Sequence, residues 1–155
     1  MKTIIRKLKK EDILTCIKII LKTNVSSNAK EAKKIMELSL VKGIKFLNPE
    51  YYILEQDKKI IGVSGLYYDY EDPKNVLWLD YLAVLSEFQG MGYGSLMFEN
   101  LKKIAKNKKV KMLCVFTDKQ KALDFYEKKG FKICGEINNY YGKNKSKIWL
   151  YKNLK

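Results

Sequence analysis

The stretch LAVLSEFQGMGYGS, residues 82–95, decides the fold of this chain. It closes a run rich in β-branched and aromatic side chains, which is typical of a strand, and its glycine-rich centre leads into apolar residues at helical spacing. Glycines let the backbone approach a ligand closely, and the first N–H groups of a helix have no partner within it. A strand, a glycine-rich turn and a helix in this order therefore indicate a cradle for an anion such as pyrophosphate.

This stretch differs from the two commonest phosphate-binding motifs. Its glycines, at positions 90, 92 and 94, do not match the dinucleotide fingerprint G-x-G-x-x-G, and the chain has no G-K-[ST] of a P-loop. A tight turn that uses glycine only for its positive φ angle remains the alternative on this stretch alone.

Two sequence motifs together carry a family resemblance. Residues 89–94, QGMGYG, match the signature [RQ]-x-x-G-x-[GA], and residues 122–131, ALDFYEKKGF, resemble A-x-x-F-Y-x-x-x-G-F. In this order and at this separation, the two motifs resemble those of the GNAT superfamily of acetyl-CoA-dependent N-acetyltransferases. The resemblance implies a GNAT (acyl-CoA N-acyltransferase) fold and transfer of an acetyl group to the primary amine of a peptide, a protein or a small metabolite.

The element order read from hydrophobic periodicity agrees with this resemblance over nearly the whole chain. We expect one α/β domain spanning residues 1–155, with a mixed central sheet of about seven strands flanked by about four helices. The predicted strands are 3–8, 51–55, 60–68, 76–84, 110–116, 131–137 and 147–152, and the predicted helices are 11–22, 29–41, 95–108 and 119–129.

In the resembling family, the fourth and fifth strands splay apart and the pantetheine arm of coenzyme A fills the gap. The resemblance places the backbone of Leu82 and Val84 against this arm and the acetyl carbonyl. The pyrophosphate would be held by backbone amides of the turn, which are those of Gln89, Gly90, Met91, Gly92, Tyr93, Gly94 and Ser95. The family commonly has an asparagine where this chain has Lys119, which leaves a cofactor contact and a solvated side chain as alternatives at that position.

The resemblance also implies catalytic roles. Tyr126 matches the tyrosine that protonates the departing thiolate, with a packed core aromatic as the alternative, and the Val84 N–H is the expected oxyanion donor. Trp78 stands where the family often has a glutamate base. Strand alternation predicts Asp80 on the same face as Trp78, Leu82 and Val84, so Asp80 is the candidate base, with a hydrogen-bonded structural aspartate as the alternative.

Acceptor-site candidates lie outside these motifs. The segment between the first two helices, with Asn24 and Ser26, should form one wall, and Trp78 should line the site. Asn139-Tyr140-Tyr141 resembles a segment of ribosomal-protein and other N-terminal acetyltransferases, so Tyr140 and Tyr141 are candidates, with plain strand aromatics as the alternative. The glutamate that this subgroup uses on the fifth strand is replaced by Cys114, which argues against specificity for peptide N-termini.

Composition excludes several classes of chemistry. The chain has no histidine, which excludes Ser-His-Asp and Cys-His catalysis and the usual imidazole zinc sites. Its three cysteines contain no C-x-x-C pair, so we expect no metal site and no disulfide framework. Charges at the N-terminus stand where a signal peptide needs an apolar core, and no segment is apolar enough to span a membrane, so we expect a cytoplasmic protein without membrane partners.

The net charge of +14 leaves two interpretations. It indicates either a polyanionic partner or a lysine-rich composition, and the single arginine, Arg6, favours the second, without specific nucleic-acid binding. Positive potential would still attract coenzyme A. Two alternatives to the enzyme remain: a non-catalytic acyl-CoA-binding regulatory protein, because the familiar asparagine and glutamate are absent, and a nucleic-acid-binding protein. The resemblance also includes homodimers, which are common in the family.

Overall fold

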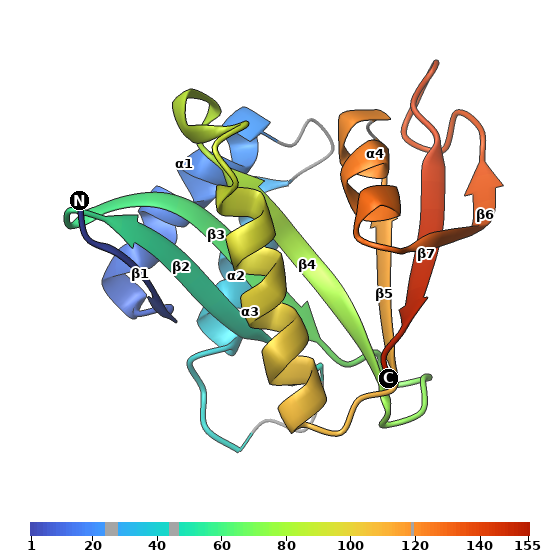
Figure 1. Ribbon diagram of the computed structural model, residues 1–155, viewed down its shortest axis with the longest axis horizontal. Helices are drawn as coiled ribbons and strands as arrows, with labels where there is room; N and C mark the ends of the chain where they lie inside the picture. Colours follow the sequence, from blue (N-terminus) through green and yellow to red (C-terminus); the bar gives the residue numbers. More distant parts are fainter. Residues whose placement is uncertain (24–27, 44–46, 119) are drawn as a thin grey trace.

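The computed structural model describes residues 1–23, 28–43, 47–118 and 120–155 (Figure 1). In this part of the chain, seven strands form one sheet in the order β1-β2-β3-β4-β5-β7-β6. The predicted mixed sheet with four α-helices is confirmed. The strands are β1 Thr3–Lys7, β2 Glu50–Gln56, β3 Lys59–Tyr67, β4 Val76–Val84, β5 Met112–Thr117, β6 Lys132–Ile137 and β7 Lys147–Asn153. The α-helices are α1 Ile13–Thr23, α2 Ala29–Leu38, α3 Tyr93–Asn107 and α4 Gln120–Lys128, and short 3₁₀ helices are η1 Lys10–Asp12 and η2 Ser86–Phe88.

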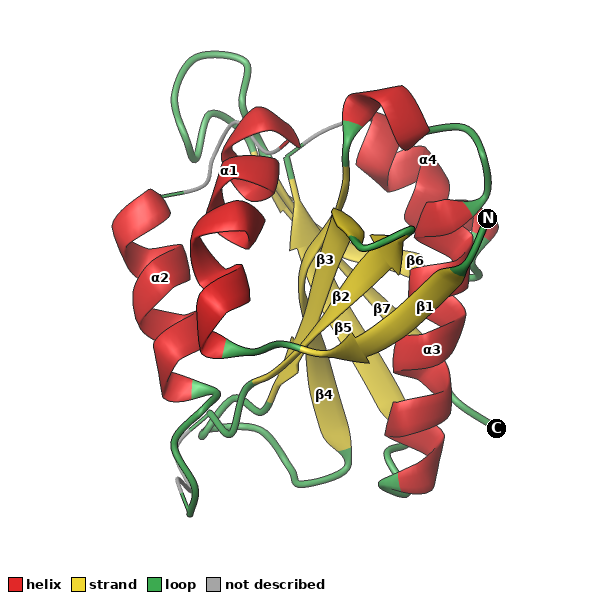
Figure 2. Ribbon diagram, turned by 90° about the vertical axis from the view of Figure 1, so that its left-hand side faces the viewer, coloured by secondary structure: helices red, strands yellow, loops and turns green. Residues whose placement is uncertain are grey.

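The sheet separates two helical layers, with α1 and α2 on one face and α3 and α4 on the other (Figure 2). Each layer buries its own apolar core. Phe98, Leu101, Leu113 and Leu150 belong to the core beneath α3 and α4, whereas Ile20, Met36 and Ile53 belong to the core beneath α1 and α2. None of the helices in the described ranges is long and apolar enough to cross a bilayer.

Most element boundaries differ from the sequence predictions by one or two residues, and local contacts explain two of the differences. Helix α2 ends at Leu38, three residues before the predicted end, and the Ser39 hydroxyl caps it by donating to the Met36 carbonyl at 2.6 Å. Strand β5 begins at Met112, two residues after the predicted start, because Val110 lies in the turn that follows α3, where its N–H donates to the Ala105 carbonyl at 3.0 Å.

Strands β4 and β5 are the parallel pair of the sheet, and they pair only at one end. Their register joins Val76 to Met112, Leu77 to Leu113 and Trp78 to Cys114, and goes no further. Beyond this point β5 continues to pair with β7 up to Thr117, while β4 continues beside β3 (Figure 1). A wedge therefore opens between β4 and β5 at their carboxyl ends, where ligands bind in open α/β sheets.

The predicted alternation along β4 is wrong beyond Asp80. The β3–β4 register shifts between Val63 and Gly65, and Tyr81 has a φ of 44°, which marks a bulge on β4. The extra residue reverses the faces: Tyr81 and Ala83 contact the core beneath α1 and α2, while Leu82 contacts the core beneath α3 and α4. Asp80 therefore shares a face with Trp78 but not with Leu82.

The three cysteines are free thiols. Burial raises the pKa of Cys16 to about 12 and that of Cys114 to about 11, so both remain protonated at neutral pH. Because the thiolate is the nucleophile, neither group is poised to act as one.

Candidate functional site

A cavity of about 980 Å³ occupies the wedge between β4 and β5. Leu79, Asp80 and Val115 line the floor of this cavity, where the two strands diverge. One end is closed by the turn before α3, and the other by α1, α2 and the β6–β7 loop. Residues of these flanking elements and of α4 also line it, among them Lys22, Thr23, Asn28, Glu31, Gln89, Gly90, Gly92, Gly94, Ser95, Phe125, Tyr126 and Tyr141.

The β3–β4 ladder shows where the backbone of β4 points. Leu85 donates its N–H to the Ile61 carbonyl on β3 at 2.9 Å, and Gly62 and Val63 lie opposite Val84 and Ala83. Because hydrogen-bonding groups alternate along an antiparallel strand, the N–H groups of Val84 and Leu82 face away from β3 and toward the wedge. The Val84 carbonyl, on the same edge, accepts a hydrogen bond from the Gln89 side chain at 2.8 Å.

The turn before α3 has the geometry of an anion cradle. Gly90 and Gly92 have φ angles of 78° and 85°, which glycine adopts without strain, and a Cβ at either would meet no atom within 4 Å. Gly92 caps α3 without a side-chain hydrogen bond, so the first N–H groups of this 15-residue helix have no acceptor within it. Open backbone and free amides at the positive end of the helix dipole suit a phosphate.

Of the predicted cradle amides, that of Gln89 is already engaged within the turn. The Gln89 N–H donates to the Ser86 carbonyl at 3.2 Å and so closes the turn rather than facing a ligand. The Tyr93 side chain turns away, since its hydroxyl accepts from Gln56 at 2.7 Å, and the Met91 side chain is exposed. Tyr93 and Met91 can therefore serve the cradle through their backbone but not through their side chains.

Lys121 is a residue of this site that the sequence did not single out. Its Nζ donates to Gln89 Oε1 at 2.8 Å, while Gln89 Nε2 donates to the Val84 carbonyl at 2.8 Å. This relay joins the first turn of α4 to the end of β4 across the mouth of the cavity. A lysine in the first turn opposes the helix dipole, and that anomaly was the available sequence signal.

The side chain of Tyr126 is buried and lines the cavity. Its ring makes edge-to-face contacts with the rings of Phe125 and Phe131. Burial is the main reason that the pKa of its phenol lies well above the usual value, and the nearby charge of Asp80 adds to the increase. The phenol is therefore fully protonated at neutral pH and can donate a proton into the cavity.

Asp80 lines the same cavity and accepts a hydrogen bond from the Tyr51 hydroxyl. Burial raises the pKa of Asp80 to about 6, although the hydrogen bonds from Tyr51 and from the Tyr81 backbone oppose the increase. A carboxylate with this pKa is largely ionised at neutral pH yet basic enough to take a proton, as general bases require.

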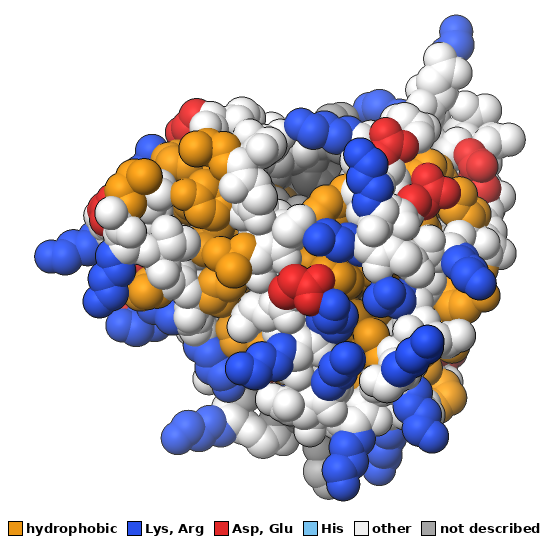
Figure 3. Space-filling view, in the orientation of Figure 1, with side chains coloured by type: hydrophobic (Ala, Val, Ile, Leu, Met, Phe, Trp, Pro, Cys, Tyr) orange, Lys and Arg blue, Asp and Glu red, His pale blue; other side chains and the backbone are white. Residues whose placement is uncertain are grey.

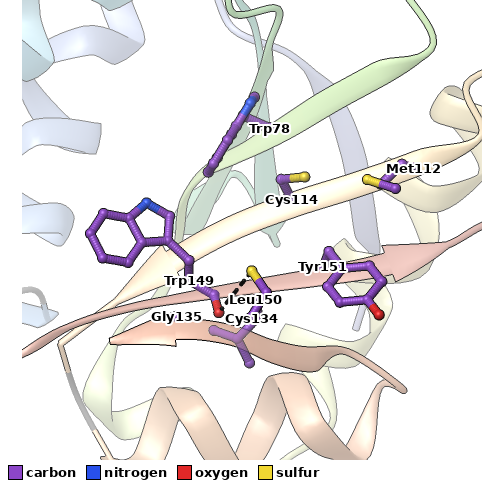
Figure 4. A pocket seen from close by; sticks show the side chains of 8 residues that line it. All are labelled: Trp78, Met112, Cys114, Cys134, Gly135, Trp149, Leu150 and Tyr151. Atoms are coloured by element: carbon purple, nitrogen blue, oxygen red, sulfur yellow. Dashed lines mark hydrogen bonds between the residues drawn. The ribbon is translucent and has the colours of Figure 1, made fainter. Parts of the chain in front are cut away.

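The other predicted acceptor residues do not all lie at the same cavity. Tyr141 lines the cavity, and Tyr140 packs edge-to-face on it with ring centroids 4.8 Å apart. Trp78 instead lines a second, apolar cavity of about 570 Å³ with Cys114 and Trp149 (Figure 4), and its indole N–H donates to Asp72 at 2.6 Å. Asn24, Ser26 and Lys119 lie outside the described residues, but Thr23 and Asn28, which flank the first two, line the cavity.

Comparison with known proteins decides the family. A model of the acetyltransferase (GNAT) family matches residues 16–131, which is most of the chain. The chain belongs to the GNAT acetyltransferase family. The family resemblance inferred from the residues around Gly92 and Tyr126 is thereby confirmed.

Solved structures share the fold of this GNAT protein at low sequence identity. An N-acetyltransferase of Staphylococcus aureus superposes with a TM-score of 0.82 at 17% identity, over 100% of both chains. The ribosomal-protein-S18-alanine N-acetyltransferase of Escherichia coli gives 0.78 at 18% identity, over 98% of this chain and 94% of that one. A GNAT acetyltransferase of Elizabethkingia anophelis with acetyl-CoA bound gives 0.71 at 22%, over 98% of each.

Proposed function

We propose that this GNAT protein is an acetyl-CoA-dependent N-acetyltransferase that acts on a primary amine. The observation that carries the proposal is the cavity in the β4–β5 wedge. It joins an anion cradle at one end to Tyr126 and Asp80 near its floor, so a phosphate-bearing thioester and two proton-transfer groups would share one enclosed space.

The residues present fit acetyl-CoA. The backbone from Gly90 to Ser95 would hold the pyrophosphate, and Lys121 would add a positive charge at the mouth of the cavity. The backbone edge of Leu82 and Val84 would pair with the amide groups of the pantetheine arm. When bound, the cofactor supplies a thioester whose carbonyl carbon is open to attack by an amine.

Three groups of the chain would then perform the transfer. Asp80, directly or through water, takes a proton from the acceptor amine, whose nitrogen forms the new bond to the carbonyl carbon. The Val84 N–H donates to the carbonyl oxygen as negative charge develops on it. Tyr126 donates its proton to sulfur as the C–S bond breaks, which yields free thiol and N-acetylated amine, and the phenol regains a proton from solvent.

Calorimetric titration with acetyl-CoA, beside NAD and ATP, tests the proposal. We expect acetyl-CoA alone to bind with micromolar affinity, and an amine-dependent release of thiol from a panel of acceptors. No binding by folded protein would overturn the proposal. Binding without turnover for any amine would instead support a non-catalytic acyl-CoA-binding regulatory protein.

A further inference from the structure

The ammonium group of Lys147 sits in a cage of three aromatic rings. Its Nζ lies 4.4 Å from the ring centroid of Phe116, 4.7 Å from that of Tyr140 and 5.0 Å from that of Trp149. All three distances fall within the range of cation–π attraction. The rings come from the end of β5, the β6–β7 loop and β7, so one lysine joins three separate segments.

The cage borders the acceptor side of the proposed active site. Phe116 and Tyr141 both line the large cavity, and Tyr140 packs against Tyr141. Phe116 also lies beside Trp78, with ring centroids 6.4 Å apart, on the face of the sheet that carries Asp80. Trp149, which pairs with Phe116 across β5 and β7, lines the second cavity together with Trp78 (Figure 4). One ring of the cage, that of Phe116, therefore also lines the cavity in which the acceptor amine would lie.

Aromatic rings orient the ammonium of Lys147 without neutralising it. No carboxylate in the described ranges lies within salt-bridge distance of its Nζ, whereas Lys33, Lys59, Lys102 and Lys108 each have such a partner. A lysine ammonium has three N–H donors, and the faces of rings satisfy these donors only weakly. A fixed, unneutralised cation at the rim of a binding cavity is complementary to an anionic group of a ligand.

We propose that Lys147 determines specificity by binding an anionic group, a carboxylate or a phosphate, on the acceptor. The inference rests on the proposed function and names the class of its substrate: an amine that carries a negative charge. The amine nitrogen would lie near Asp80, and the anion would lie at the Phe116–Tyr140–Trp149 cage. Lys22, which lines the cavity from α1, adds a further positive charge to the cavity lining.

Matched acceptors test the charge requirement directly. β-Alanine and β-alaninamide differ in the carboxylate, and phosphoethanolamine and ethanolamine differ in the phosphate. We expect the native protein to favour the anionic member of at least one pair by about tenfold or more in kcat/KM, mainly through KM. The pair that shows the preference identifies which anion is bound.

Three variants separate binding from a structural role. Lys147→Met keeps an apolar chain among the rings but removes the charge, and we expect it to abolish the preference. Lys147→Arg keeps both the charge and the cation–π contact and should retain it. Lys143→Met removes an equal charge from an exposed position of the β6–β7 loop, which precedes Lys147, and should change nothing. Equal losses for both members of a pair in Lys147→Met, or a preference for the uncharged members in the native protein, would overturn the inference.

A binding measurement tests the inference without turnover. In Trp78→Phe, Trp149 is the remaining tryptophan, and its fluorescence should change when N-acetyl-β-alanine or N-acetyl-phosphoethanolamine binds at the cage. Adding Lys147→Met should abolish that change. A response to neither anion would overturn the inference, whereas failure of the proposed function would appear separately, as absent binding of acetyl-CoA in the calorimeter.

Discussion

Tyr126 and Asp80 have their pKa values moved in the same direction by burial, with opposite chemical uses. For the phenol of Tyr126, the higher pKa keeps the proton in place at neutral pH, as the proposed general acid requires. For Asp80, a pKa of about 6 makes the carboxylate a stronger base while leaving most of it ionised at neutral pH. Burial in one cavity therefore gives each group the protonation state that the proposed acid or base requires.

Changing Tyr126 to phenylalanine should slow turnover without weakening cofactor binding. The hydroxyl is lost, but the ring contacts with Phe125 and Phe131 remain. We expect kcat to fall by about 10²-fold, the scale of general-acid catalysis, with the Kd for acetyl-CoA nearly unchanged. Thiol-release kinetics and calorimetry measure the two quantities. Tyr151→Phe, in the second cavity, is the control, and equal losses of kcat and affinity in Tyr126→Phe would remove the acid assignment.

Asp80 should impose a pH dependence on turnover. Because the base must be ionised and its pKa is about 6, kcat should rise as the pH increases through 6 and then level off. Asp80→Asn should lower kcat by about 10²-fold or more and remove this acidic limb. The pH–rate profile is compared with that of Asp124→Asn, an exposed aspartate. If the limb survives in Asp80→Asn, another group is the base.

Irregular backbone in two elements, β4 and the start of α3, forms the candidate site on the sheet. The bulge at Tyr81 leaves Asp80 on the face covered by α1 and α2 and turns Leu82 to the face covered by α3 and α4. The left-handed glycines then turn the chain so that α3 directs its free amides at the same cavity. Local backbone irregularity, rather than additional side chains, brings the cradle and the proton-transfer groups together.

Placing a carboxylate in the cradle should abolish binding of acetyl-CoA. Gly92→Asp introduces strain at a φ of 85° and a negative charge where the phosphate would lie. Calorimetry should detect no acetyl-CoA binding, while circular dichroism should show a folded protein. Gly43→Asp is a matched control, since Gly43 has a φ of 79° and equally open surroundings outside the cavity lining. Normal binding by folded Gly92→Asp would refute the cradle.

A glycine on β3 makes room for the partner of Asp80. A Cβ at Gly65 would lie 2.7 Å from Cδ1 of the Tyr51 ring, so Gly65→Ala must displace that ring. We expect the free energy of unfolding to fall by about 1–3 kcal/mol. The pKa of Asp80 should also rise as it loses the Tyr51 donor, which moves the acidic limb of kcat to higher pH.

Denaturant unfolding and the pH–rate profile measure these two effects of Gly65→Ala. Gly135→Ala is the control, because its Cβ would make an ordinary contact of 3.7 Å with Trp149. An unchanged limb in a destabilised Gly65→Ala would show that Tyr51 does not tune Asp80.

The net charge of the whole molecule affects how charged ligands approach it, rather than its fold. Lysines are scattered over the face that carries α3 and α4, with few acidic residues among them (Figure 3). With a net charge of +14, the field extends beyond any single side chain and attracts a polyanionic cofactor. The same field repels strongly cationic acceptors, which agrees with the proposed anion-bearing acceptor.

Association with acetyl-CoA should therefore depend on salt. We expect the association rate constant, measured by stopped-flow fluorescence, to fall by about tenfold as ionic strength rises to levels that screen charges over a few ångströms. The dissociation rate should change much less. Acetyl-pantetheine, which lacks the phosphates, is the control ligand and should show little salt dependence. A salt-independent rate for acetyl-CoA would show that the lysines do not guide its approach.

Much of the fold was predictable because it depends on local patterns. Alternation in the strands, helical spacing and the glycines at 90, 92 and 94 are set by neighbouring residues, and the β4–turn–α3 unit follows from them. The two motifs around Gly92 and Tyr126 likewise determined the family. Exclusion of histidine and metal-knuckle chemistry also needed only the composition.

Only the tertiary structure decided which side chains meet. The bulge at Tyr81 depends on pairing with β3, so alternation alone misplaced Leu82, and Trp78 was drawn into a second cavity by contacts with β5 and β7. Lys121 reaches Gln89, and Lys147 reaches Phe116, across more than thirty positions of sequence in each case. Such contacts depend on the packing of distant segments, which no local pattern encodes.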